Sequence, residues 1–453
     1  MKTYTAAVDL GTTKVVSLVG EKSESGYKII AFKEAPSKGI MRGEVVNIMN
    51  VLESLNPTLQ EIKEENNIEI KEVFVGIAGQ HIRCTDEGCK RNRQRPDQLI
   101  SQKEVDDMRE EMYKTRVNAG EKILHVIPQS YNVDDHIGQT EVVGMVGSQI
   151  EGNYKIFIGR TNSAEHSKSV IARAGLKLKE LVLEPVASAL AVVSEEEMEM
   201  GVAMVDIGGG TTDLLIIEDN IIRHTAVIPF GGNSITEDLK QGCGVSSRNA
   251  EQMKIQYGSC ITDYAPDNKT VVIPGIGGRD SREVSFKVIA SIIEARVAEI
   301  VEAIMYEIER SGYQDKLAAG IVLTGGGSQL AHICNYVSYK TGYETRIASP
   351  KINITFDSPE AVSKPSSSTA VGLLIYGIEN SKYDNAPLQS EGNRMIDTTL
   401  FPEEEIVAVE APAATAADDR KKQPKAPKQN SGKFFSNVKD RIGIFFESGD
   451  NEA

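Results

Sequence analysis

Two short segments of the chain combine an aspartate, glycines and paired threonines, residue types that suit contacts with phosphate groups. The first segment runs from Asp9 to Lys14 and the second from Asp206 to Asp213. In a tight turn, glycine leaves backbone N–H groups open to a ligand, and threonine hydroxyls can donate to phosphate oxygens. A carboxylate at the end of a strand can hold Mg²⁺ through the water molecules that the ion retains. The two segments therefore predict a site for the phosphate chain of a nucleotide with Mg²⁺.

The predicted phosphate contacts come from both segments. They are Asp9, Gly11, Thr12, Thr13, Lys14, Asp206, Gly208, Gly209, Gly210, Thr211 and Thr212. Asp9 and Asp206 are the candidate Mg²⁺ residues, acting through water, and Lys14 or Thr12 is the candidate for direct contact with phosphate. A P-loop is excluded, because the sequence holds no GxxxxGK[ST] run.

Apolar runs on both sides of each segment indicate two hairpins, each made of a strand, a tight turn and a strand. Their spacing of about 200 residues indicates an internal repeat in which two similar halves face each other. A third strand, Ile321–Thr324, leads into a turn formed by Gly325, Gly326 and Gly327. A single hairpin of this kind is as consistent with an unliganded glycine turn as with a site. Two matching hairpins and a third glycine turn favour the site.

Helices are needed to position these turns, and apolar residues at helical spacing indicate where they lie. The clearest predicted helices are Lys168–Ala174, Val186–Val193, Ser247–Gln256, Val288–Ser311 and Ser367–Gly377. The chain has 453 residues, more than one hydrophobic core usually supports, so two or three domains are expected.

The composition excludes several classes of function. A net charge of −15 argues against general nucleic-acid binding, which needs a basic face. The five cysteines lack the spacing of a metal site and are expected to be reduced thiols of a cytosolic protein. A strand is expected almost from the first residue, so no secretory signal is expected, and no run of about 18 apolar residues occurs. Arg91, Arg93 and Arg95 are expected on a solvated loop, with a polymer contact as the alternative.

With its two phosphate segments, third glycine turn and two connecting helices, the sequence resembles the superfamily of actin, sugar kinases and heat-shock chaperone ATPases. The connecting helices begin near Glu184-Pro185 and Ser367-Ser368. Within that superfamily, about residues 1–380 resemble the FtsA family of bacterial cell-division proteins. The stretches that carry this closer resemblance are 38–48, 76–82, 125–129 and 201–213.

The resemblance implies an actin-like α/β fold with two lobes, with ATP and Mg²⁺ in the central cleft. It also implies an FtsA-type subdomain, 1C, in place of the usual second subdomain. The implied layout is 1A in 1–81, 163–183 and 366–380, 1C in 82–162, 2A in 184–230 and 318–365, and 2B in 231–317. A disordered linker is expected at 381–432 and an amphipathic helix at 433–447.

Further site residues rest on the resemblance, including Gly325, Gly326 and Gly327 as the adenosine turn. By position, Glu251 and Lys254 would lie near the ribose and adenine, and an exposed i, i+3 ion pair is the alternative.

Glu184 would position water for hydrolysis, and an acid that is simply favoured at a helix start is the alternative. ATP binding is therefore expected, with at most weak ATPase activity. Whether the protein hydrolyses ATP is left open.

The last predicted element, 433–447, places apolar side chains on one arc of a helix with cations at the margins. The residues expected at a membrane are Phe434, Phe435, Val438, Lys439, Arg441, Ile442, Phe445 and Phe446. Such a helix fits the interface of an anionic membrane, to which the upstream lysines add attraction. Docking on the protein itself or on a partner is the alternative. The preceding linker of about 50 residues, with a span of roughly 40 Å, is predicted to act as a tether.

The resemblance implies a protein that anchors the FtsZ ring to the cytoplasmic face of the inner membrane at the division septum. Its implied partners are FtsZ, whose C-terminal tail would bind subdomain 2B, further copies of itself in actin-like filaments, and later division proteins. Arg296 is the candidate contact for an acidic tail, and a surface salt bridge within its own helix is the alternative. Two other functions stay open: a small-molecule kinase of the same superfamily and a PilM-like pilus-assembly protein.

Overall fold

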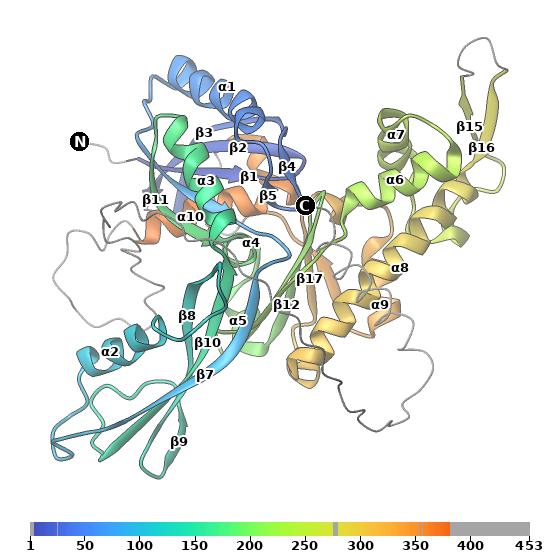
Figure 1. Cartoon of the computed structure of the whole chain (residues 1–453). Helices are drawn as coiled ribbons and strands as arrows, with labels where there is room; N and C mark the ends of the chain where they lie inside the picture. The colour runs from blue at the N-terminus through green and yellow to red at the C-terminus, as the bar shows by residue number, and fades with distance from the viewer. Residues whose placement is uncertain (1–3, 25, 275–279, 352, 356, 381–453) are drawn as a thin grey trace, which may run out of the picture. The chain divides into compact units, whose positions relative to one another are not determined.

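Three sheets of four or five strands organise the part of the chain that the computed structural model describes, residues 4–380 without 25, 275–279, 352 and 356 (Figure 1). Two of these sheets have five strands and one has four. The predicted linker at 381–432 and the predicted amphipathic helix at 433–447 lie outside the described residues.

The two five-stranded sheets share one topology. The first has the order β11-β6-β1-β2-β3, with β1 (Thr5–Leu10), β2 (Lys14–Ser23), β3 (Gly26–Pro36), β6 (Glu72–Ile77) and β11 (Lys177–Leu183). The second has the order β14-β13-β12-β17-β18, with β12 (Val202–Ile207), β13 (Thr212–Glu218), β14 (Ile221–Ile228), β17 (Ile321–Thr324) and β18 (Thr345–Ile347). In both sheets an antiparallel meander of three strands continues into two parallel strands. The predicted repeat and both predicted hairpins are confirmed.

Two helices fill the space between the repeated sheets, α4 (Glu184–Val192) and α10 (Ser368–Asn380). One hydrophobic core joins them to alternate residues of both sheets, among them Ala7 of β1 and Met204 of β12. A second core lies on the other face of the first sheet, under α1 (Ile48–Asn66) and α3 (Thr161–Arg173). Because side chains alternate along a strand, the residues two positions after Ala7 and Met204 also face α4 and α10. Those residues are the two predicted Mg²⁺ aspartates.

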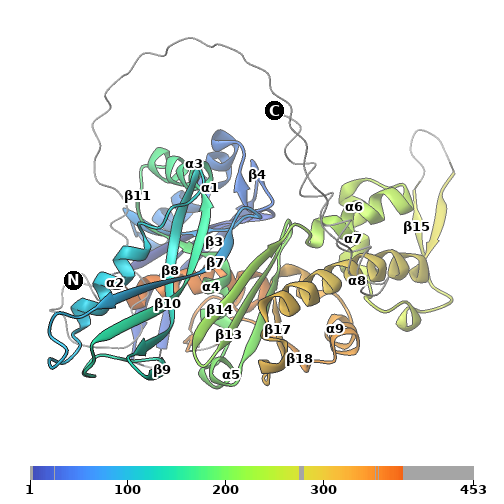
Figure 2. The same ribbon diagram turned by 60° about the horizontal axis from the view of Figure 1, so that its bottom comes forward.

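A four-stranded sheet with its own core is inserted between β6 and α3. Its strand order is β7-β10-β8-β9, with β7 (Arg83–Asn92), β8 (Glu121–Val133), β9 (His136–Gln139) and β10 (Gln149–Arg160), and α2 (Gln102–Met112) packs on it. Met108, Tyr131 and Tyr154 belong to this separate core. Figure 2 shows the insert with α2 along one side of its sheet. This unit corresponds to the region predicted as subdomain 1C, whose boundaries remain a prediction.

Further helices and a hairpin belong to the second half of the folded chain. They are α5 (Glu195–Met200), α6 (Gly232–Cys243), α7 (Ser247–Tyr257), α8 (Phe286–Ser311), α9 (Ile333–Thr341), β15 (Thr270–Ile273) and β16 (Arg282–Ser285). Of these, α5, α8 and α9 pack on the second repeated sheet, whereas α6, α7 and the hairpin strand β16 pack on α8. The remaining short elements are β4 (Ile40–Met41), β5 (Glu44–Val45), η1 (Thr262–Tyr264), η2 (Gln314–Lys316), η3 (Gly326–Gln329), η4 (Glu360–Ser363) and η5 (Pro365–Ser367). In the described part of the chain, no helix combines the length and apolar character needed to cross a bilayer.

The predicted helices correspond to α3, α4, α7, α8 and α10. The largest difference is in α3, which begins at Thr161 rather than at Lys168. The first turns of α3 bury Ser163, Ala164 and Ser167 against the protein. Because these side chains are small or polar, the apolar pattern that marks a helix begins late in the sequence.

Candidate functional site

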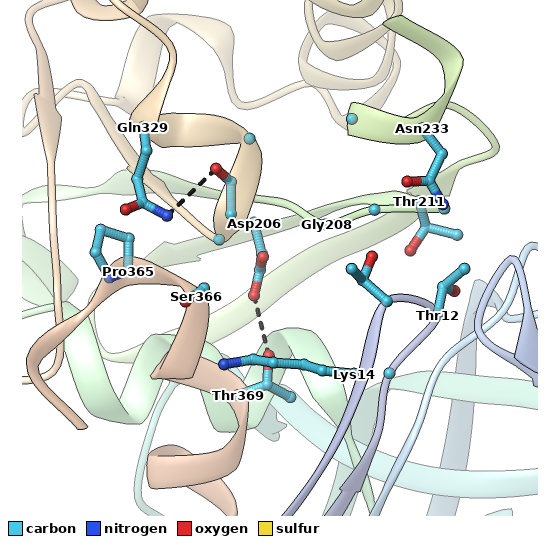
Figure 3. Close-up of a pocket in the computed structure, with 18 of the residues that line it drawn as sticks. Thr12, Lys14, Asp206, Gly208, Thr211, Asn233, Gln329, Pro365, Ser366 and Thr369 are labelled. Carbon is cyan, nitrogen blue, oxygen red and sulfur yellow. Dashed lines mark hydrogen bonds between the residues drawn. The ribbon is translucent and has the colours of Figure 1, made fainter. Parts of the chain in front are cut away.

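The turns of the two predicted phosphate segments lie against each other (Figure 3). A Cβ atom added at Gly209 would overlap the hydroxyl of Thr13, and one added at Gly210 would lie 2.8 Å from the hydroxyl of Thr12. Glycine at these positions therefore permits an approach that a side chain would prevent. The structure brings together the two segments that the sequence analysis assigned to one site.

A cavity of about 610 Å³ opens beside the two turns, a size typical of small-molecule sites. All predicted residues of the nucleotide site line it except Thr212. The Thr212 hydroxyl is buried and donates to the carbonyl of Phe230 at 2.8 Å, so it supports the turn from behind. Cavity residues that the sequence analysis did not assign include Asp213, Gly232, Asn233, Gln329, Lys364, Ser366 and Thr369.

The start of α6 supports the second turn. The backbone N–H groups of Gly232 and Asn233 donate to the carbonyls of Gly208 and Gly209 at 2.9 and 2.8 Å. Within the turn, the N–H of Gly208 donates to the carbonyl of Thr211 at 2.9 Å. These bonds hold the turn in a fixed shape before any ligand binds, so less conformational entropy is lost on binding.

Asp206 connects the second turn to both central helices. Its Oδ2 accepts hydrogen bonds from the hydroxyl of Ser188 in α4 at 2.7 Å and from that of Thr369 in α10 at 3.1 Å. Figure 3 shows the bond to Thr369. The two hydroxyls also lie 3.0 Å from each other. Asp206 therefore lies where both helices and the second hairpin meet.

Four carboxylates from different elements lie near one another at this site: those of Asp9, Glu184, Asp206 and Asp213. Asp213 is the one that was not predicted from the sequence to belong to the site. Asp206 and Asp213 are directly opposite each other across β12 and β13. Like charges at opposed positions of a sheet repel. Asp213 Oδ1 is buried and makes no hydrogen bond. The signal was present in the sequence, because Asp213 ends the second phosphate segment.

Burial raises the pKa values of these four acids, and at Asp9, Glu184 and Asp213 the neighbouring carboxylates add to the shift. Burial, and to a smaller extent Asp206, raises the pKa of Asp9 to about 7, although Lys14 opposes the shift. Burial and the neighbouring aspartates raise the pKa of Glu184 and of Asp213 well above the usual carboxyl range. A divalent cation near these groups would relieve the repulsion and favour their ionised forms. Within the described residues, no three His, Cys, Asp or Glu side chains form a metal-chelating group.

Asp9→Asn is expected to raise the melting temperature of the nucleotide-free protein at pH 8. The folded protein holds this proton up to about pH 7, whereas the unfolded chain releases it near 3.8, so stability falls as the pH rises between these values. The asparagine does not ionise, so the variant avoids this loss of folding stability at high pH. A gain of 1 kcal/mol in the free energy of unfolding corresponds to a rise of about 2–4 °C in melting temperature. Thermal denaturation from pH 5 to pH 8 should show a difference from wild type that grows with pH. A difference that is independent of pH, or equal to that of the exposed Asp135→Asn control, would contradict this assignment.

Glu184 is the first residue of α4 and lines the cavity. The backbone of Gly76 makes room for it, because a Cβ atom at that position would lie 2.8 Å from Glu184 Cγ. The position agrees with both interpretations given above, an acid at a helix start and an acid beside the phosphate turns. The water-positioning role stays a prediction.

Glu251 and Lys254 also line the cavity, and they form the i, i+3 ion pair at 2.8 Å. Lys254 is buried, and its Nζ also donates to the carbonyl of Gly232 at 3.0 Å and to the hydroxyl of Thr236 at 2.9 Å. Thr236 in turn donates to Glu251. The pair therefore joins α7 to α6 beside the cavity, and contact with a ribose or base stays a prediction.

The third glycine turn completes the wall of the cavity. Gly325 has φ 82° and ψ 170°, a conformation that essentially only glycine adopts. Its N–H donates to the carbonyl of Pro365 at 3.2 Å. The turn therefore packs on the segment that leads into α10, and it approaches the second hairpin closely enough that a Cβ atom at Gly325 would lie 2.6 Å from the carbonyl oxygen of Ile207.

Arg296, the predicted partner contact, lies in α8 away from this cavity. Its guanidinium donates two hydrogen bonds to Asp238 of α6, at 2.6 and 2.9 Å, and one to Glu299 at 2.6 Å. The salt bridge within its own helix is thus present, together with a stronger two-point pair to another helix. Contact with a partner stays a prediction.

Comparison with known proteins gives a consistent result. A family described as "Cell division protein FtsA" matches residues 203–372, and an "SHS2 domain inserted in FTSA" matches residues 79–158. The cell division protein FtsA of Pseudomonas aeruginosa is 34% identical over 82% of this chain and 88% of its own length. The FtsA proteins of Neisseria meningitidis and Escherichia coli are 35% and 31% identical, over 82% of this chain and 89% and 90% of their lengths.

Solved structures share the fold at lower sequence identity. The PilM-PilN type IV pilus biogenesis complex contains a chain with a TM-score of 0.57 and 16% identity, covering 83% of this chain and 99% of that one. MreB5 of Spiroplasma citri bound to ADP has a TM-score of 0.50 and 16% identity, covering 84% of this chain and 99% of that one. These similarities establish an actin-like ATPase fold with an SHS2 insert.

Proposed function

The chain belongs to the FtsA family of cell-division proteins, and from that membership we propose that it binds ATP with Mg²⁺ between its two hairpin turns and links an FtsZ polymer to the membrane. The single observation that carries the nucleotide part is the direct contact of the two turns beside a cavity of about 610 Å³. The related MreB5 structures with ADP and with AMPPNP support a nucleotide at this fold. The pilus and kinase alternatives are not favoured, because the relatives at 31–35% identity are FtsA proteins and the PilM similarity extends to the fold alone.

The chain's own groups suit this ligand. Backbone N–H groups of the two turns would donate to phosphate oxygens, with Thr12, Thr13 and Thr211 hydroxyls beside them. The acids Asp9, Asp206 and Asp213 would hold the water shell of Mg²⁺, and the cation would supply neutralisation of phosphate charge. The unbonded Oδ1 of Asp213 fits this role, because a buried oxygen without a donor needs one.

The nucleotide would act through the contact between the lobes. Asp206 joins the second hairpin to α4 and α10, so a ligand that engages both turns would also fix both helices. Such a ligand favours the conformation in which the turns are in contact, by its difference in affinity for the two states. We expect this conformation to be the one that self-associates into actin-like filaments. Turnover, with Glu184 positioning water, remains a separate question from binding.

The proposed link to the membrane rests on the sequence after residue 380. On a helix over 433–447, six apolar side chains would lie on one arc, with Lys439 and Arg441 at its margins. Burial of a large apolar side chain contributes about 1.5–3 kcal/mol, so several together suffice for peripheral binding. FtsZ, through an acidic C-terminal tail on the 2B region, and later division proteins are the proposed partners of the folded part. The proposed location is the cytoplasmic face of the inner membrane at the septum.

Deletion of residues 433–453 is expected to abolish cosedimentation with anionic liposomes and to lower FtsZ recruitment to those liposomes at least about tenfold. The test is reconstitution of the full chain with FtsZ on anionic liposomes, with and without MgATP. A matched control replaces Ser436 and Asn437, on the opposite side of the predicted helix, with alanine, and it should bind as wild type does. Unchanged liposome binding by the deletion variant would refute the anchor, and FtsZ that stays in solution with the intact chain would refute the link.

A further inference from the structure

A cysteine of the inserted sheet contacts a histidine of the second repeated sheet, outside the nucleotide site. Cys84 lies in β7 and His224 in β14, and Cys84 Sγ is 3.5 Å from His224 Nδ1. On the other side of the ring, His224 Nε2 is 3.1 Å from Glu307 Oε2 in α8. Three elements far apart in the sequence thus form a line of thiol, imidazole and carboxylate. Neither the nucleotide site nor the proposed link to the membrane uses these residues.

The geometry suits a thiolate beside an imidazolium. An imidazolium donates from both ring nitrogens, here toward Cys84 Sγ and toward Glu307. His224 is buried, and Glu307 also accepts from Arg310 at 3.2 Å. A second positive group near Cys84 is Lys155, a buried lysine whose charge is paired with Asp86 at 2.8 Å. Positive charge therefore faces the sulfur from β14 and from β10, and the carbonyl oxygen of Thr225 in β14 also lies 3.6 Å from it.

The electrostatics of the three groups agree with this arrangement. Burial lowers the pKa of His224, but Cys84 and Glu307 outweigh burial and raise it to about 9. Burial raises the pKa of Cys84, but the hydrogen bond and charge of His224, helped by the backbone of Thr225 and the charge of Lys155, lower it below the usual thiol value. Burial likewise opposes ionisation of Glu307, whereas His224 and Arg310 lower its pKa.

The other four cysteines provide an internal comparison. All five are free thiols, and burial raises the pKa of Cys89, Cys243, Cys260 and Cys334. Cys89 and Cys334 are partly exposed, as Cys84 is. Access to solvent alone therefore does not single out Cys84, whereas its contact with His224 does. The thiolate, not the thiol, is the reactive form of cysteine.

We propose that Cys84 is a modification site, a nucleophilic thiolate paired with His224 that small hydroperoxides oxidise to a sulfenic acid. The thiolate sulfur attacks one peroxide oxygen, so an S–O bond forms and the O–O bond breaks. The leaving oxygen takes the electron pair and accepts the proton of the His224 imidazolium, which yields water or an alcohol and a neutral imidazole. Sulfur is oxidised and the peroxide is reduced. The modification falls at the contact between the insert and the second lobe.

Site-resolved alkylation of the reduced full chain with iodoacetamide, read by mass spectrometry from pH 5.5 to pH 9, tests the thiolate. At pH 7 an ordinary thiol with a pKa near 8.5 is only a few per cent ionised, so Cys84 is expected to react at least about tenfold faster than Cys89 and Cys334. Its titration midpoint should lie below those of Cys89 and Cys334. One equivalent of hydrogen peroxide followed by dimedone should then label Cys84 first. Equal rates at the three cysteines, or dimedone label that is absent from Cys84, would overturn the proposal.

His224→Gln tests whether the imidazole, rather than solvent exposure, makes the Cys84 thiol reactive. The variant should move the Cys84 midpoint upward and slow its alkylation at pH 7 at least about fivefold, with Cys89 and Cys334 unchanged. His166→Gln, a change at a part-buried histidine that contacts the carbonyl of Val45, serves as the matched control. An unchanged Cys84 profile in a folded His224→Gln would overturn the proposal. If that variant fails to fold, the wild-type profile still decides, because it needs no substitution.

Discussion

Asp206→Ala is expected to lower the affinity for MgATP at least about 100-fold, the largest effect on binding that we predict. The side chain accepts bonds from Ser188 and Thr369 and lies directly across from Asp213. Removing it deletes one carboxylate of the proposed Mg²⁺ site and the group that joins the second hairpin to α4 and α10. Hydrogen bonds to charged groups contribute about 1.5–3 kcal/mol each. The loss of both the Mg²⁺ contact and the link to the helices is therefore enough for a loss of affinity of about 100-fold.

Retention of labelled ATP on a filter, with and without Mg²⁺, measures this prediction. The fold should persist, because Ser188 and Thr369 lie 3.0 Å apart and can bond to each other when the carboxylate is gone. Removing one of four crowded acids also relieves repulsion, so the nucleotide-free variant is expected to melt no lower than wild type. Asp135→Ala, at an exposed turn of the insert, is the control and should retain ATP. Undiminished binding by Asp206→Ala would remove the basis for the site assignment.

Gly325→Ala is expected to destabilise the protein by more than about 3 kcal/mol and to remove its stabilisation by MgATP. The φ of 82° and ψ of 170° at this residue lie in a region that costs an alanine on the order of 1–3 kcal/mol. In addition, the new Cβ atom would overlap Asp206 Oδ1 and lie 2.6 Å from the carbonyl oxygen of Ile207. A backbone oxygen within a strand cannot move away without breaking the sheet, so the third turn must leave the second hairpin.

Gly326→Ala gives the matched control one residue further along the chain. A Cβ atom there would find its nearest neighbour, Ser366 Cβ, at 3.9 Å, which is ordinary van der Waals contact. Its free energy of unfolding in urea should therefore lie within about 1 kcal/mol of wild type. If the two alanine variants unfold at the same urea concentration, the backbone argument for Gly325 is wrong. Melting curves with and without MgATP then show whether the nucleotide response is lost together with stability.

The sequence was sufficient to predict the two hairpins, the third strand and the residues of their turns. Their strands are apolar runs bounded by glycine and threonine, and such local patterns are expressed in the same way wherever the segments lie. The repeat of one pattern also predicted that two similar halves exist. The contact of Gly209 and Gly210 with Thr13 and Thr12 follows from that pairing of halves.

Interactions between residues far apart in the chain could not be predicted as well from the sequence. Arg93, expected on a solvated loop, has a side chain only 3% exposed, and it donates to Glu104 and to the carbonyls of Gln98, Leu99 and Gly147. That expectation was wrong because a run of arginines indicates solvent only when no acid and no unpaired carbonyls face it. Arg296 likewise pairs mainly with Asp238 of another helix. Neither partner could be identified from spacing along the chain.

The sequence by itself determined the strands, the turns and the chemistry of each segment, because backbone conformation and side-chain type depend on near neighbours. Only the tertiary structure decided which acids share one environment. Asp9, Glu184, Asp206 and Asp213 come from four different elements. Burial raises the pKa of each of them, and neighbouring carboxylates add to the shift at Asp9, Glu184 and Asp213. The same holds for Cys84, His224 and Glu307, whose bonds join three elements. Coulomb and desolvation energies depend on distance and burial in space, which no spacing along the chain reports.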